Sequence, residues 1–330
     1  MRENSRQDKK INSIYGKLFQ QSGTTISLIL VYIIICIVFT CLSGYFLTIQ
    51  NFLNIGTYAS ITGIMAAGVT VAMILGHIDM SQYATLTLAT MVTALMLQNG
   101  VPVGITIIAA IGVGMLCGMI NGFLVAFFKI PGIIVTMGTM QAFRGVAYLL
   151  TNGNTVMIRN RSFDFIGKGY MFGGFPFSIL LMIIVFVIIT YLLKYTNFGR
   201  KIFAVGGNEQ VSYLSGISIR SIKFWGMVVS GICAAIAGLI TCSQVGAAIP
   251  STGTGSEMEV LSGVILGGVS LSGGKGKISG TVIGVLILAT IQNGMTLLSL
   301  QSFYQMIVNG CVLVLAVMLD VVKGGALKRE

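Results

Sequence analysis

The sequence predicts an all-α integral membrane protein with about ten membrane-spanning helices, and three observations lead to this fold class. Of its 330 residues, 55% are hydrophobic and only 9% are charged, and the mean hydropathy is +0.92. The apolar residues form successive runs of about 20 residues, the length that crosses the hydrocarbon core of a bilayer. The lysines and arginines lie at the ends of these runs, where such residues set the orientation of a chain in the membrane.

The chain is basic, with a formal net charge of +11 at pH 7. Binding of nucleic acid would require these cations to cluster on one accessible face, so their positions between apolar runs predict no nucleic-acid partner. The six cysteines all lie in apolar stretches without C-x-x-C spacing, which predicts neither a disulfide framework nor a metal site. They are Cys36, Cys41, Cys117, Cys233, Cys242 and Cys311.

Five spans are predicted in the first half of the chain. Residues 1–25 form a polar, basic tail, which predicts a cytoplasmic N-terminus. Residues 26–46 are too long an apolar run for a signal-peptide core and are interpreted as the first span. After a short amphipathic stretch at 47–55, which should lie at the membrane surface, the next spans are predicted at residues 57–76, 83–98, 102–128 and 133–150.

Five further spans follow an extracytoplasmic loop at residues 151–174, whose cations are a mild exception to the positive-inside rule. They are predicted at residues 175–193, 224–245, 258–271, 278–298 and 303–322. Residues 323–330 then form a basic cytoplasmic tail. The transmembrane domain therefore covers residues 26–322, and both termini are predicted to lie in the cytoplasm.

The polar segment 196–223 separates two strongly apolar runs, and its positive charge predicts that it faces the cytoplasm. Its middle has the pattern of a short capped helix. Asn208 suits the N-cap, Glu209 adds negative charge to the first turn, Val211 and Leu214 lie on one face, and Gly216 can end the helix. From the residues alone, an ordinary loop between helices and a docking helix both remain open.

Three stretches carry a resemblance to one family. They are Phe198-Gly199-Arg200 with Gly206 to Glu209 and Leu214 to Ile217; Leu266 to Lys277 with Gly280-Thr281; and Gly76 to Ser81. The chain resembles, from about Asn51 onward, the permease subunits of the ribose and simple-sugar class of ATP-binding-cassette (ABC) importers. The third stretch departs from that family's G-G-I-D-L-S pattern at His77 and Met80.

In that family the first stretch is a coupling segment that contacts a separate ATPase chain. The resemblance therefore implies that the ATPase docks on Gly207, Asn208, Glu209, Val211, Leu214, Ser215 and Gly216. The second stretch implies a cytoplasmic hairpin at Gly273, Gly274, Lys275, Gly276 and Lys277, where glycines permit a tight turn and lysines hold it inside. Residues 271–274 mimic the start of an ABC ATPase signature, but no G-x-x-x-x-G-K-[ST] loop is present. ATP and magnesium are thus expected on the partner ATPase, with no cofactor in this chain and no enzyme activity of its own.

Asp79 is the most informative polar residue inside the spans, because a carboxylate at mid-bilayer costs roughly 2.5–3.5 kcal/mol. It either caps the third helix by accepting backbone N–H groups, or lines the path with His77 and binds sugar hydroxyls. Further path candidates are Asn121, Gln141, Arg144 and Asn293, which could instead serve as hydrogen-bonding contacts between helices. Glu257 and Glu259 could meet an extracytoplasmic partner or form an exposed, solvated acid pair.

An internal repeat is weakly visible, because Gly63 and Gly68 of the second span match Gly226 and Gly231 of the seventh. Spans 2–5 and 7–10 would then be copies of opposite orientation. The family resemblance implies a type II importer fold like that of the vitamin B12 importer permease. Glycine spacing of four in the fourth and ninth spans, at Gly114, Gly118, Gly122, Gly280 and Gly284, predicts close helix packing within one subunit, or less simply a route between subunits.

The resemblance implies the function: a permease subunit that forms the translocation path for a ribose-like sugar in a bacterial inner membrane. The expected partners are the ABC ATPase, an extracytoplasmic sugar-binding protein, a second permease chain, identical or closely related, and membrane lipid. Two alternatives stay open, a carrier of nucleosides or another small polar solute and an ion-coupled secondary transporter. The latter would need acidic residues at broken helices, for which only Asp79 qualifies.

Overall fold

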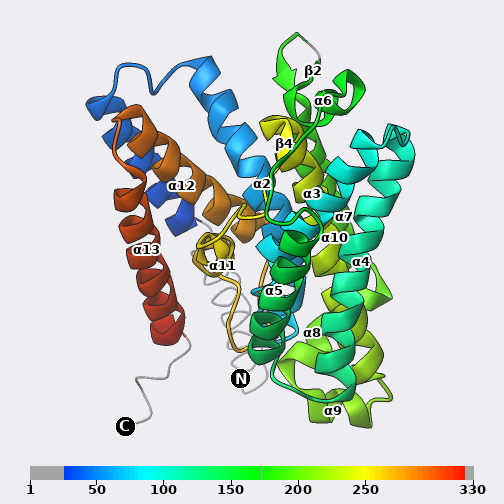
Figure 1. The fold of residues 1–330 in the computed structure, drawn as a ribbon. Helices are drawn as coiled ribbons and strands as arrows, with labels where there is room; N and C mark the ends of the chain where they lie inside the picture. Colours follow the sequence, from blue (N-terminus) through cyan, green and yellow to red (C-terminus); the bar gives the residue numbers. More distant parts are fainter. Residues whose placement is uncertain (1–25, 172, 324–330) are drawn as a thin grey trace, which may run out of the picture.

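The computed structural model describes residues 26–171 and 173–323, so the predicted tails at 1–25 and 324–330 lie outside the described residues. The chain is almost entirely helical (Figure 1). The first half contains a helix at Ile26–Leu42, then α2 (Ile49–Ile74), α3 (Gln82–Gln98), α4 (Val103–Phe127), α5 (Gly132–Leu149), β1 (Val156–Met157), α6 (Arg161–Lys168) and β2 (Tyr170–Met171). The second half contains β3 (Phe175–Pro176), α7 (Phe177–Tyr195), α8 (Asn197–Gly207), α9 (Glu209–Leu214), α10 (Ile219–Val245), β4 (Ala247–Ala248), α11 (Glu257–Leu266), α12 (Ile278–Leu297) and α13 (Ser302–Lys323).

Proline and glycine set many of the helix boundaries. Pro102, Pro131 and Pro176 immediately precede α4, α5 and α7, where a missing backbone N–H costs nothing and the fixed φ angle suits the helix start. Gly246 ends α10 in the left-handed conformation, with φ of 74°. These are local features, which is why the predicted starts of α4, α5 and α7 lie within two residues of the observed ones and the predicted end of α10 coincides with the observed one.

A helix lies over each of the ten predicted ranges, but the helices differ in length. Among the described residues, α2, α4, α7, α10 and α12 are long and apolar enough to cross a membrane. By contrast, α11 has 10 residues and is about 15 Å long, half the thickness of the hydrocarbon core. The predicted surface stretch at 47–55 is not separate, because α2 begins at Ile49 and continues through it.

The centre of the bundle is an antiparallel pair, α2 and α10. Close approach depends on small residues, since a Cβ added to Gly68 would lie 2.8 Å from Cys233 Cβ and 3.0 Å from Ser230 Cα. Helix α4 packs on the other side of α10, where a Cβ at Gly118 or at Gly122 would lie 2.7 Å from backbone atoms of α10. The prediction that Gly118 and Gly122 pack helices within one subunit is confirmed.

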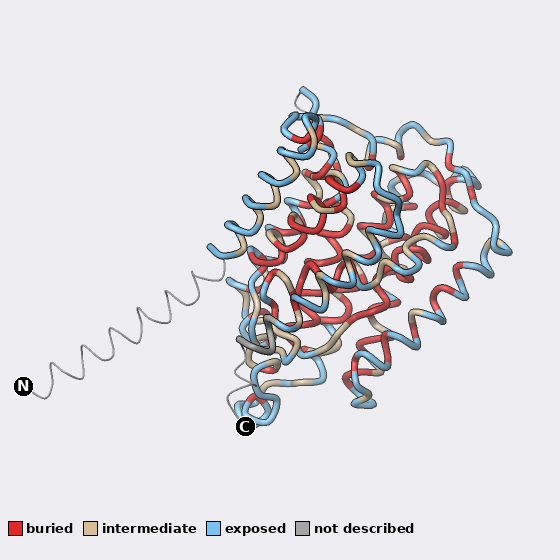
Figure 2. The backbone as a smooth tube through the Cα atoms, turned by 90° about the vertical axis from the view of Figure 1, so that its left-hand side faces the viewer, coloured by how far each residue is buried: buried red, intermediate tan, exposed pale blue. Residues whose placement is uncertain are grey.

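Helix α12 packs on α2, and α11 crosses α12 so closely that a Cβ at Gly267 would lie 2.6 Å from the Gly280 backbone. A hydrogen bond of 2.8 Å joins Thr70 Oγ1 on α2 to Thr281 Oγ1 on α12. Buried residues are concentrated in the interior of the bundle and exposed residues on its outer helices (Figure 2). The exposed side chains of α4, α7 and α13 include many large apolar ones, among them Ile108, Val187 and Val314, as expected for helices that face lipid.

The predicted loop 151–174 is folded onto one end of the bundle, here called the α6 end; α8 and α9 lie at the opposite end, called the α9 end (Figure 1). Strand β1 pairs with β4, and α6 packs on α10 through the fully buried Phe163. The Ser243 hydroxyl of α10 accepts a 2.8 Å hydrogen bond from Gly167 N and lies 2.9 Å from the Phe163 carbonyl oxygen. This segment is therefore an ordered cover over the end of α10 and not a free loop.

Candidate functional site

The first candidate site is the short helix α9, whose predicted cap is confirmed. The Asn208 side chain accepts a 3.0 Å hydrogen bond from Val211 N, and Glu209 occupies the first turn. Beyond the last turn, Ser215 bonds back to Val211 O and Gly216 adopts φ of 76°. These local bonds make a six-residue helix stable enough to present side chains in fixed positions.

The exposed face of α9 is apolar although the helix lies outside the spans. Leu214 is 81% exposed, and Val211 and Tyr213 are also largely exposed. A salt bridge of 2.7 Å between Lys223 Nζ on α10 and Glu209 Oε1 fixes α9 against the bundle. An apolar surface held rigidly outside the membrane has the character of a protein docking site.

The predicted hairpin and the predicted coupling segment meet at the α9 end. Gly274 N donates a 2.8 Å hydrogen bond to Ile74 O, the last residue of α2. A Cβ at Gly273 would lie 2.9 Å from Gly206 O, and one at Gly274 would lie 2.7 Å from Gly207 Cα. Both hairpin glycines have positive φ angles, 79° and 69°. Three backbone segments far apart in the sequence therefore touch without intervening side chains.

The rest of the hairpin has two different surroundings. Gly276 is half-buried, and a Cβ there would lie 3.0 Å from Val269 Cγ1 and 3.1 Å from Ile74 Cγ1. Lys275 and Lys277 are exposed. The hairpin thus presents two lysines beside α8 and α9.

His77 lies in the connection between α2 and α3, at the α9 end. It is half-buried against Gly132, and its Nε2 has no hydrogen-bond partner among the described residues. Burial, together with the positive charge of Lys223, lowers the pKa of His77 to about 4, against a smaller opposing effect of Glu209. The imidazole is therefore neutral at physiological pH and belongs to the surroundings of the α9–α10 ion pair.

A buried polar network surrounds Asp79, which is 3% exposed. Its Oδ1 accepts from Ser81 N at 2.9 Å and from Ser81 Oγ at 2.6 Å. Its Oδ2 accepts from Gln82 Nε2 at 3.1 Å and from Ser230 Oγ at 2.7 Å. Each carboxylate oxygen thus has two donors, which is how a buried carboxylate can be kept without a cation.

The network continues to α4 and α5. Asn121 Nδ2 donates to Ser81 Oγ at 2.8 Å, and Thr139 Oγ1 donates to Asn121 Oδ1 at 2.6 Å. The start of α3 is thereby joined to α4, α5 and α10. Ser81 is the N-cap residue of α3, and among the four donors to Asp79 only Ser81 N is a backbone group. The capping prediction for Asp79 is therefore borne out only in part, because the carboxylate fixes the start of α3 mainly through side chains. The sequence had not identified Gln82, Thr139 or Ser230 as participants, because single hydroxyl and amide groups in apolar helices carry no pattern of their own.

A second polar cluster surrounds Arg144 of α5. Its Nη2 forms a 2.9 Å salt bridge with Glu257 Oε1, and its Nη1 donates to Thr252 O at 3.3 Å and to Thr254 Oγ1. Glu259 is 4% exposed, and its Oε1 accepts from Tyr58 OH at 2.8 Å. The alternative of an exposed, solvated acid pair at these two glutamates is therefore wrong. Both acids lie in the first turn of α11, where the helix dipole also favours negative charge.

The six predicted path residues do not gather in one place. Asp79 and Asn121 share the buried network, and His77 lies toward the α9 end. Gln141 is exposed on α5, one turn from Arg144. Asn293 on α12 is half-buried, and its Oδ1 has no partner among the described residues.

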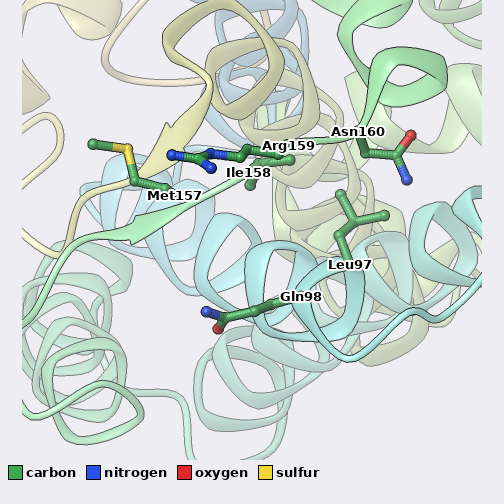
Figure 3. Close-up of a pocket in the computed structure, with 6 residues that line it drawn as sticks. All are labelled: Leu97, Gln98, Met157, Ile158, Arg159 and Asn160. Atoms are coloured by element: carbon green, nitrogen blue, oxygen red, sulfur yellow. The ribbon is translucent and has the colours of Figure 1, made fainter.

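A pocket of about 390 Å³ lies where the end of α3 meets the connection from β1 to α6 (Figure 3). It is lined by Leu97, Gln98, Met157, Ile158, Arg159 and Asn160.

No group of three or more His, Cys, Asp or Glu side chains with metal-binding geometry occurs in the described part of the chain.

Comparison with known proteins gives consistent matches. A family model described as the permease component of branched-chain amino acid transport systems matches residues 51–317. The ribose import permease protein RbsC of Bacillus subtilis (strain 168) is 38% identical over 308 residues, which cover 93% of this chain and 94% of that protein. RbsC of Escherichia coli (strain K12) is 40% identical over 298 residues, covering 89% and 92% of the two chains. The L-arabinose transport system permease protein AraH of E. coli (strain K12) is 37% identical over 306 residues, covering 93% and 92%. No solved structure shows significant similarity to the chain.

Proposed function

Because the chain belongs to the family of branched-chain amino acid transport system permease components, we propose that it is the membrane subunit of an ATP-driven importer and forms the translocation path for a simple sugar. The observation that carries this proposal is full-length similarity to permeases named for ribose and L-arabinose. A further relative is named for xylose. All three sugars are pentoses, so a pentose is the expected substrate class, and the nucleoside alternative is not favoured. The chain is a transporter subunit and not an enzyme.

The ATPase partner docks on the α9 end. The exposed apolar face of α9, continued by Gly207 and by Ser215 and Gly216, is the proposed contact surface, and its fixed position on α10 supports this role. ATP and magnesium bind to that partner. The contact between α8 and the hairpin at Gly273–Gly274 lets a displacement of α9 reach α2 and α11–α12 together.

The chain crosses the membrane about ten times, with the α9 end and both termini in the cytoplasm. Helix packing supports the inverted repeat. In this repeat α2, α3, α4 and α5 correspond to α10, α11, α12 and α13. The contact of α4 with α10 then corresponds to the contact of α12 with α2. The contacts of α3 with α4 and with α5 correspond to the contacts of α11 with α12 and with α13. All of these pairs pack together, and α2 and α10 run antiparallel. A type II fold of this kind works with a second permease chain and receives sugar at the α6 end from a binding protein.

Of the predicted path residues, Gln141 and Arg144 on α5 are retained. Gln141 is an exposed amide on an otherwise apolar face, and the side chain of Arg144 keeps 10% of its surface exposed. Asp79 and Asn121 are assigned to holding the start of α3, since their hydrogen-bonding groups are already occupied. The occupied carboxylate of Asp79 also argues against an ion-coupled transporter, which would need an available acid.

The test is co-purification of the tagged protein from native membranes in a mild detergent, followed by uptake of labelled ribose, arabinose and xylose. An ABC ATPase is expected to co-purify, and uptake should require ATP. Leu214→Ser should reduce recovery of the ATPase at least tenfold. Leu47→Ser, which alters another exposed leucine, at the α6 end, should leave recovery unchanged. Uptake driven by an ion gradient, without a co-purifying ATPase, would contradict the proposal.

A further inference from the structure

The corner between α7 and α8 combines three kinds of side chain that a phospholipid contacts. Along α7, Ile184, Ile188, Tyr191 and Tyr195 follow one another at intervals of three or four residues, and all four are exposed. The two tyrosine rings lie 5.7 Å apart at the end of this stripe. In membrane helices, exposed tyrosines mark the level of the headgroups.

Three cations lie close to the tyrosines along the chain. Lys194 lies in the last turn of α7, with its Nζ 5.2 Å from the centre of the Tyr195 ring. The chain then bends at Thr196, whose side chain accepts from Gly199 N at 3.1 Å and so starts α8. Arg200 and Lys201 lie on the exposed side of α8, opposite the buried Gly199, Ile202 and Val205.

These cations have no acidic partner among the described residues. Arg200 donates only to the neutral amide oxygen of Asn197, and none of the three forms a salt bridge in the described part of the chain. The sequence contains no aspartate or glutamate between Asp164 and Glu209. By contrast, Lys168 and Lys223 each lie beside a carboxylate. The corner therefore carries uncompensated positive charge next to an apolar and aromatic stripe.

We propose that the α7–α8 corner binds the headgroup of an anionic phospholipid, with Lys194, Arg200 and Lys201 around the phosphate and the Ile184–Tyr195 stripe along an acyl chain. Charge complementarity favours an anionic over a zwitterionic lipid. Each lysine or arginine is attracted to the phosphate of an anionic headgroup, whereas in a zwitterionic lipid the positive charge of the choline group opposes this attraction. The ATPase is the competing occupant. The tyrosines oppose it, since they place the corner at the membrane surface and not beyond it.

The site has a structural consequence for α8. A headgroup held between the end of α7 and the first turns of α8 would fix the angle at which α8 leaves the membrane. The other end of α8 carries Gly206, which touches Ile74 and Gly274. Lipid bound at this corner would therefore act on the same helix that links α9 to the hairpin.

The test compares retention of phosphatidylglycerol and phosphatidylcholine by the purified, delipidated protein, measured by native mass spectrometry during lipid titration. The wild type should retain phosphatidylglycerol about tenfold more strongly than phosphatidylcholine. The double variant Lys194→Gln/Arg200→Gln should lose that preference without a change in phosphatidylcholine retention. The matched control Lys129→Gln/Arg220→Gln removes one lysine and one arginine elsewhere at the α9 end. This control should keep the preference for phosphatidylglycerol over phosphatidylcholine.

Equal retention of the two lipids by the wild type would overturn the proposal, as would equal loss of preference in the control. Loss of ATPase co-purification in Lys194→Gln/Arg200→Gln, with phosphatidylglycerol retention unchanged, would assign the corner to the ATPase and also overturn it. Lys201→Glu provides a second variant at an exposed position and should weaken phosphatidylglycerol retention further than neutralisation does. Thermal unfolding of each variant verifies that the proteins tested are folded.

Discussion

Gly206 is the position where a single methyl group should separate the coupling segment from the rest of the bundle. A Cβ at this residue would overlap the Ile74 carbonyl oxygen and lie 2.9 Å from Gly274 N, the two atoms that form the hydrogen bond between α2 and the hairpin. Both neighbours are backbone atoms, so no side-chain rotation can relieve the overlap. Gly206→Ala must therefore move α8 away from α2, or move the hairpin.

The magnitude follows from three contributions. Overpacking against rigid atoms costs about 1–3 kcal/mol, and loss of the Gly274–Ile74 hydrogen bond adds about 1 kcal/mol. Replacement of glycine by alanine within a helix returns about 0.5–1 kcal/mol. The net expectation is a destabilisation of about 1–3.5 kcal/mol. Gly207→Ala is the matched control, because a Cβ there meets nothing within 4 Å, and it should be neutral or slightly stabilising.

The assay is thermal unfolding of the purified permease in detergent, followed by fluorescence of Trp225, the single tryptophan of the chain. Gly206→Ala should unfold several degrees below both the wild type and Gly207→Ala. In the assembled importer, Gly206→Ala should also lower sugar uptake more than ATP hydrolysis, since α9 can still dock on the ATPase while its link to α2 is weakened. An unfolding midpoint for Gly206→Ala equal to that of Gly207→Ala would refute the argument that these backbones are in contact.

Three further predictions follow from the polar contacts, each tested by unfolding midpoints in detergent. Arg144→Met should destabilise the protein by about 2–3 kcal/mol because it leaves Glu257 largely buried and unpaired, whereas Arg144→Met/Glu257→Met should recover part of the loss; equal midpoints for the two variants would contradict this. Ser230→Ala should cost about 1–3 kcal/mol, since Asp79 and Gln82 both lose a partner, while Ser251→Ala on the exposed loop should cost little. His77 has a pKa of about 4 in the folded protein, below its value in the unfolded chain, so the unfolded chain binds a proton more readily. The contribution of neutral His77 to the free energy of unfolding is therefore fully present above about pH 6.5 and is lost as the pH falls toward 4. The wild type should therefore lose about 1–2 kcal/mol more than His77→Gln between pH 7.5 and pH 5, and parallel pH profiles would show that His77 is not buried as described.

The sequence by itself determined the class of the protein, the positions of its helices and the form of α9. Apolar runs, proline-led helix starts and the Asn208 cap are properties of neighbouring residues, and they act before any tertiary contact exists. The resemblance carried by residues 198–217 and 263–293 also indicated the family, because its motifs are short and local. Local patterns did not predict the length of a helix where that length depends on tertiary packing. The eighth predicted span is helical only at Glu257–Leu266, because hydropathy does not distinguish a spanning helix from a short one buried within protein.

Only the tertiary structure decided which polar groups are partners. Asp79 bonds to Ser230 from another helix, Arg144 pairs with Glu257, and Gly274 reaches Ile74 across most of the chain. The physical reason is that lipid and protein interior are equally apolar, so an apolar run does not specify its neighbour; neighbours are chosen by close approach at small residues and by the few polar groups that must be satisfied away from water. Those two requirements are met by the whole bundle at once, and no single stretch of the sequence contains them.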